Sequence, residues 1–97
     1  MDQLQQEIVE WADEVFPERT LTNALTKLVL EEVPELWRDL RDTGSLNPLE
    51  LADVAILLLD VAHLADIDLE VAVRDKMQIN RNRAWVLRNG VMIHENK

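Results

Sequence analysis

The chain has 97 residues, the length of a single domain, and its 47% hydrophobic and 30% charged residues are typical of a globular protein. It contains no cysteine, which excludes disulfide scaffolds and Cys-ligated zinc or iron–sulfur sites. The net charge of −9 argues against general binding to nucleic acids or membrane surfaces. The N-terminus is acidic, without the basic and apolar regions of a signal peptide, so we expect a cytoplasmic protein.

Hydrophobic periodicity predicts four helices, over residues 3–15, 20–41, 48–65 and 68–84. Trp11 lies on the apolar stripe of the first helix, and we expect it in the core. Asn47 and Pro48 are typical of the N-cap and first position of the third helix. That helix is apolar nearly all round, so we predict that it is central and has neighbours from its own chain and from a second subunit.

The C-terminal tail, residues 85–97, differs from the rest in pattern and charge. Asn89-Gly90 between two apolar tetrapeptides predicts a short β-hairpin or tight turn. Residues 1–70 carry 17 acidic and 4 basic residues, whereas residues 71–97 carry 2 and 6. The predicted architecture is one all-α domain over residues 1–97, with an acidic body and a basic C-terminal segment.

Acidic residues occur where apolar ones are expected. Each helical residue advances by about 100°, which places Glu32 inside the leucine arc of the second helix and Glu35 at its edge. A solvated charge run would instead lie opposite the leucines. Pro34 cannot donate to the carbonyl of Leu30, so we expect a kink or short break over residues 30–34.

Glu50 and Asp53 form a second acidic pair, spaced i, i+3 on the third helix. If the second and third helices pack antiparallel, five carboxylates can converge: Glu31, Glu32, Glu35, Glu50 and Asp53. Without a nearby His or Cys, such a set favours Mg²⁺, with Mn²⁺ as a substitute. Two simpler interpretations stay open. Glu50 can be the capping-box partner of Asn47, and Glu31 can form a surface i, i+4 pair with Lys27.

These segments together resemble the MazG-type nucleotide pyrophosphohydrolases, members of the all-α NTP pyrophosphatase superfamily. The family pattern is ExxE, a spacer, ExxD and then a helix that carries Lys and Asn. The matching residues, within a resemblance that spans residues 4–85, are Glu32 and Glu35, Glu50 and Asp53, and Lys76 and Asn80. Pro34 departs from the pattern, because a small residue is more usual there.

The resemblance implies a four-helix MazG-like bundle, assembled as a homodimer or homotetramer. It also implies Mg²⁺-dependent cleavage of a (d)NTP between the α and β phosphates, which removes unwanted nucleotides from the pool. Glu32 is the candidate general base, or a ligand like the other four acids, and Lys76 is the second catalytic candidate. The residues expected to contact phosphate or sugar are Lys27, Lys76, Asn80 and Arg83.

Two other functions are consistent with parts of the sequence. The acids can form the surface of a non-enzymatic helical interaction or regulatory module, although such a surface needs exposed acids and Glu32 lies among leucines. A di-iron carboxylate protein needs two Glu-x-x-His pairs, whereas this chain offers Asp60-x-x-His63.

Overall fold

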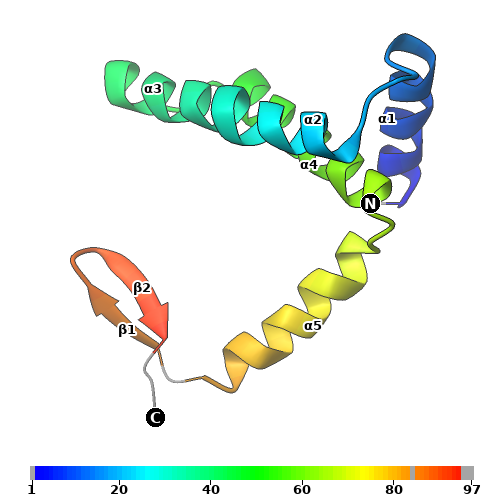
Figure 1. Ribbon diagram of the computed structural model, residues 1–97. Helices are drawn as coiled ribbons and strands as arrows, with labels where there is room; N and C mark the ends of the chain where they lie inside the picture. The colour runs from blue at the N-terminus through cyan, green and yellow to red at the C-terminus, as the bar shows by residue number, and fades with distance from the viewer. Residues whose placement is uncertain (1, 84, 95–97) are drawn as a thin grey trace.

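The computed structural model describes residues 2–83 and 85–94, which form a helical body and a projecting arm (Figure 1). The body consists of α1 (Asp2–Val15), α2 (Leu21–Lys27), η1 (Leu28–Glu32), α3 (Val33–Thr43) and α4 (Pro48–Leu64). The arm consists of α5 (Leu69–Arg81) and the strands β1 (Trp85–Arg88) and β2 (Val91–His94). The predicted helices and C-terminal hairpin are therefore confirmed.

The second predicted helix is continuous but changes its winding in the middle. Segment η1 is a π-helical turn between α2 and α3, and the N–H of Val33 donates to the carbonyl of Leu28, five residues back. Pro34, which has no N–H, follows this turn directly at the start of α3. The irregularity expected over residues 30–34 is thus a local widening of the helix rather than a break. Helix α3 ends at Thr43, two residues after the predicted boundary, and Gly44, at φ 77°, is its C-cap.

Helix α4 occupies the centre of the body and contacts α1, α2, η1 and α3. Its N-terminus is capped as predicted, because the Asn47 side chain accepts a hydrogen bond from the N–H of Leu49. We expected Trp11 in the core, but 53% of its surface is exposed, so this prediction is wrong. Few apolar residues of the described chain are buried, and half of them are alanines: Ile8, Ala12, Ala24, Leu28, Leu59 and Ala62.

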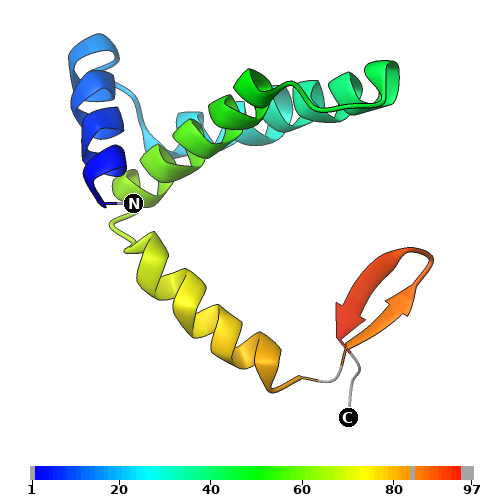
Figure 2. The same cartoon turned by 180° about the vertical axis from the view of Figure 1, so that it is seen from behind.

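The arm extends away from the body in both views (Figures 1 and 2). Helix α5 is capped by Asp68 and buries none of its residues within the described chain. It ends at Arg81, short of the predicted residue 84, because the N–H groups of Asn82 and Arg83 turn back to carbonyls three residues earlier. Arg83 therefore lies beyond the helix, and Ala84 lies outside the described residues. Asn89 and Gly90 have positive φ and close the antiparallel hairpin.

One chain by itself is extended. Its radius of gyration is 16.1 Å, whereas a compact domain of this length has about 12.5 Å. Its accessible surface is 7651 Å², against about 5,700 Å² for a compact monomer of this mass. Among the described residues, no helix combines the length and apolar character needed to cross a bilayer.

Candidate active site

Three of the predicted acids converge between the continuous helix formed by α2, η1 and α3 and the central helix α4. Glu32 ends η1, Glu35 lies in the first turn of α3 and Glu50 lies in the first turn of α4. One carboxylate oxygen from each lies within 4.8 Å of the others. Desolvation and the charges of Glu35 and Asp53 raise the pKa of Glu50 above its ordinary 4.5. An all-oxygen donor set of this kind suits a hard divalent cation.

The other two predicted ligands lie differently. Asp53 is one turn after Glu50 on α4 and lines the same pocket as Glu32. Glu31 is not part of the cluster of Glu32, Glu35 and Glu50, and its side chain is 57% exposed whereas that of Glu32 is 13% exposed. Its carboxylate accepts from Lys27 Nζ at 2.9 Å, which is the surface i, i+4 pair left open by the sequence.

Lys27 connects Glu31 with the cluster. Its Nζ lies 2.9 Å from Glu31 Oε2 and 3.3 Å from Glu32 Oε1. These two carboxylates raise the pKa of Lys27, so the ammonium keeps its charge at neutral pH. Lys27 also lines the pocket and is half-exposed, so an anionic ligand can reach it.

The carboxylates Glu32 and Asp53 line a pocket of about 830 Å³ between α1, the α1–α2 loop, α2 and α4. Its lining is mainly apolar and includes the rings of Trp11 and Phe16. These rings meet edge to face, with centroids 5.7 Å apart. A mainly apolar pocket of this size with a few charged groups is typical of small-molecule binding.

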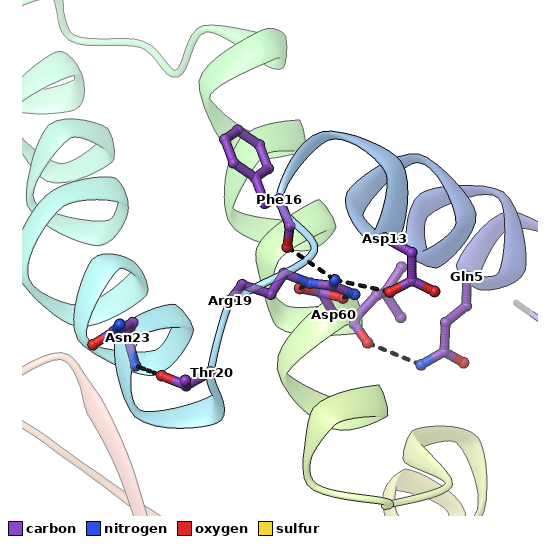
Figure 3. Close-up of polar contacts among 8 residues, drawn as sticks. Gln5, Asp13, Phe16, Arg19, Thr20, Asn23 and Asp60 are labelled. Atoms are coloured by element: carbon purple, nitrogen blue, oxygen red, sulfur yellow. Dashed lines mark hydrogen bonds and ion pairs between the residues drawn. The ribbon is translucent and has the colours of Figure 1, made fainter.

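A buried ion pair supports this pocket (Figure 3). Arg19, in the α1–α2 loop, donates from Nε to Asp60 Oδ2 at 2.7 Å and from Nη2 to Asp60 Oδ1 at 2.8 Å. It also donates to Asp13 at 2.9 Å and to the carbonyl of Phe16 at 3.4 Å. The hydrogen bonds to Asp60 raise the pKa of Arg19. Sequence reasoning missed this pair, although Asp60 is a lone acid in an apolar run and therefore needs a partner.

Glu50 is not the capping-box partner of Asn47, the simpler interpretation left open by the sequence. The N–H of Asn47 donates instead to Oδ2 of Asp39, on α3, at 2.6 Å. Asp39 was not among the predicted residues, because it is eight positions from Asn47 and the loop between the two helices brings them together.

The basic arm stands apart from the acidic cluster. Lys76 and Asn80 lie on α5, and Arg83 lies just after it. Because α5 projects from the body, one chain does not bring these residues to Glu32 (Figures 1 and 2). The side-chain oxygen of Asn80 is enclosed and accepts no hydrogen bond from the described residues, while its carbonyl accepts from Trp85 Nε1.

No protein-family model matches the chain. It is 42% identical over 93 residues to a dATP/dGTP diphosphohydrolase of Cyanophage S-2L, a match that covers 95% of this chain and 85% of that protein. It is 51% identical over 83 residues to a dATP/dGTP diphosphohydrolase of Salmonella phage PMBT28, covering 84% of this chain. The match spans 27% of that second relative's length.

A solved structure extends this similarity to three dimensions. It is that of the Cyanophage S-2L MazG-like pyrophosphohydrolase bound to dGDP and three catalytic Mn²⁺ ions per active site. The TM-score is 0.82 at 42% identity, and the match covers 98% of this chain and 96% of the other. Sequence and fold agree over almost the whole length, and the chain belongs to the MazG-like pyrophosphohydrolases, the family that its motifs resemble.

Proposed function

We propose that this protein is a metal-dependent hydrolase of purine deoxynucleoside triphosphates, dATP and dGTP, which releases the monophosphate and pyrophosphate. The observation that carries the proposal is the convergence of Glu32, Glu35 and Glu50 beside a pocket of nucleotide size. Two relatives with that named activity support the choice of substrate. Removal of unwanted nucleotides is the cellular role that we propose to follow from it.

The cluster fits divalent cations. Its three carboxylates offer oxygens within 4.8 Å of one another, and Asp53 adds a fourth from the next turn of α4. We propose Mg²⁺ as the ion, with Mn²⁺ as a substitute. Bound divalent cations neutralise phosphate charge and help to ionise a water molecule. Lys27, already beside Glu32, can turn its ammonium toward a phosphate oxygen.

Glu32 is the residue best placed to act as general base. Its side chain is largely buried at the cluster, where little bulk water competes for it. It accepts a proton from a water molecule whose oxygen forms a bond to the α-phosphorus, while the bond from that phosphorus to the bridging oxygen breaks and pyrophosphate leaves. The apolar wall formed by Trp11 and Phe16 receives the base, for which stacking on an aromatic ring contributes about 1–3 kcal/mol.

The proposal includes a second copy of the chain. One chain leaves about 2,000 Å² more surface exposed than a compact monomer, which is the area that an obligate dimer buries per subunit. The body is acidic and the arm is basic. An arm from one subunit therefore complements the carboxylates of another, and Lys76, Asn80 and Arg83 reach the phosphates across that interface.

The test is pyrophosphate release from separate dATP, dGTP, dCTP, dTTP, ATP and GTP samples with Mg²⁺ or Mn²⁺. The two purine deoxynucleotides should be the preferred substrates. Glu32→Gln should reduce turnover by at least about a hundredfold, the loss expected for a general base. Asp53→Asn should also abolish activity.

Glu31→Gln is the matched control, because it removes the same charge one residue away, from a side chain that is 57% exposed and pairs with Lys27 outside the cluster. It should retain activity within about fivefold, the scale of a surface ion pair. Absence of turnover by folded protein with every nucleotide and both metals contradicts the proposal, and equal losses in the two glutamine variants contradict the role of Glu32.

A further inference from the structure

Asp39 accepts the hydrogen bond that the local sequence predicts for Glu50. Asn47 is the N-cap of α4 and Glu50 is its third helical residue, the spacing at which an acidic side chain folds back to the N-cap N–H. In the structure this N–H is taken by Asp39, which accepts it at 2.6 Å from the neighbouring helix. Glu50 instead contributes to the carboxylate cluster with Glu32 and Glu35.

We propose that Asp39 is a positioning residue for the metal site, because it occupies the N–H of Asn47 and so leaves Glu50 free to serve as a ligand. The inference rests on the proposed metal-dependent function. The two acceptors compete for one donor, since a backbone N–H provides a single hydrogen. A charged acceptor at 2.6 Å forms a strong hydrogen bond and holds the start of α4 against α3.

Removal of Asp39 has a specific expected consequence. With the N–H of Asn47 unpaired, the carboxylate of Glu50 gains a donor in its own helical turn, where it also escapes the repulsion of Glu35. In the metal-free variant the carboxylate of Glu50 then lies away from Glu32 and Glu35, so the cluster offers one metal-ligating carboxylate fewer. Metal binding must pull Glu50 away from this N–H, and the affinity for the ion falls.

The experiment measures Mn²⁺ binding to the full chain without nucleotide, by electron paramagnetic resonance of the free ion. Asp39→Ala should weaken binding at least tenfold. Asp39→Asn retains a neutral acceptor and should stay within threefold of the wild type. Asp42→Ala is the charge-matched control, because Asp42 lies on the same helix with an exposed side chain that pairs with Arg41. It should change the affinity less than twofold.

A double-mutant cycle with Glu50→Gln tests whether Asp39 acts through Glu50. If it does, Asp39→Ala should cause almost no further loss in the Glu50→Gln background. Should Asp39→Ala not fold, Asp39→Ser replaces it, since its hydroxyl is too short to reach Asn47. Thermal unfolding of each variant identifies a general loss of structure.

The outcomes separate this inference from the proposed function. If the wild type binds no Mn²⁺, the metal part of the proposed function fails. If the wild type binds Mn²⁺ and Asp39→Ala binds it equally well, the positioning role is wrong. Equal weakening by Asp39→Asn and Asp39→Ala, or additive losses in the cycle, overturns the role as well, because both point to a charge effect that does not pass through Glu50.

Discussion

At the scale of single residues, neighbours in sequence have different surroundings. Glu31 and Glu32 are adjacent, yet one side chain faces solvent and the other lies at the cluster. The helical phase of Glu32 among leucines predicted its inward direction. The positions of Glu50 and Asp60 could not be predicted in the same way, because they depend on other elements: Asp39 accepts the hydrogen bond from the N–H of Asn47, and Arg19 pairs with Asp60.

The raised pKa of Glu50 predicts how the metal-free protein responds to pH. A carboxyl whose pKa is higher in the folded state stabilises the fold below its unfolded pKa, and this contribution is lost as pH rises through the raised value. Glu50→Gln cannot ionise, so its melting temperature without metal should exceed that of the wild type at neutral pH, and the difference should shrink toward pH 4.

Differential scanning fluorimetry with and without Mn²⁺ measures this effect. The ion should raise the melting temperature of the wild type more than that of Glu50→Gln, because the variant lacks one ligand. A lower melting temperature for metal-free Glu50→Gln at neutral pH would show that the ionised side chain stabilises the fold, contrary to the expectation.

The Arg19–Asp60 pair makes a prediction about stability. Both side chains are almost entirely buried, so Arg19→Met leaves an unpaired carboxylate inside the protein. Such losses destabilise proteins by about 3–5 kcal/mol, whereas apolar replacement of both partners is often close to neutral. Urea unfolding should therefore show a large loss for Arg19→Met and a partial recovery for Arg19→Met with Asp60→Leu. No recovery in the double variant would show that Arg19 acts through contacts other than Asp60.

At the scale of elements, local signals predicted most boundaries. Asn47-Pro48 begins α4 and Asn89-Gly90 closes the hairpin, because each dipeptide has backbone preferences that need no tertiary contact. The residues around Pro34 predicted an irregular helix. They could not distinguish a break from the π-helical turn η1, since packing against α4 influences which form is stable.

Helix α5 makes a prediction about assembly. Helix α5 has 13 residues, and none of them is buried by the described part of the chain, so it is marginal on its own and its apolar stripe of Leu69, Val73 and Met77 is expected to pack against a partner. If the chain forms the proposed oligomer, Met77→Glu should convert it to a smaller species in sedimentation velocity. Gln78→Glu adds the same charge about 100° around the helix from Met77, outside the apolar stripe, and should leave the assembly intact. A monomeric wild type at micromolar concentration would contradict the prediction.

At the scale of the whole molecule, the acidic body and the basic arm of one chain are separate (Figure 1). The charge difference between residues 1–70 and 71–97 was visible in the sequence. The sequence did not show where the acidic and basic parts lie in space. Hydrophobic periodicity places helices along the chain, but it does not say which chain each helix packs against.

Subunit complementation tests whether the arm acts on a second copy. Glu32→Gln and Lys76→Met should each be inactive alone. If Lys76 serves the partner's cluster, a mixture with exchanged subunits contains intact sites and should recover about a quarter of wild-type activity. Pyrophosphate release before and after exchange measures this recovery. No recovery, with exchange confirmed by differently tagged chains, would place Lys76 and Glu32 of the same chain in one site.

The sequence by itself determined the helices, the hairpin, the acid pairs and the family resemblance, because these depend on residues a few positions apart or on motifs in a fixed order. The tertiary structure decided which acids meet. Glu31 pairs with Lys27 outside the cluster. The N–H of Asn47 donates to Asp39, and Glu50 lies beside Glu32 and Glu35. The physical reason is that hydrogen bonds and charge repulsion act over a few ångströms in space, and the loop between α3 and α4 sets those distances.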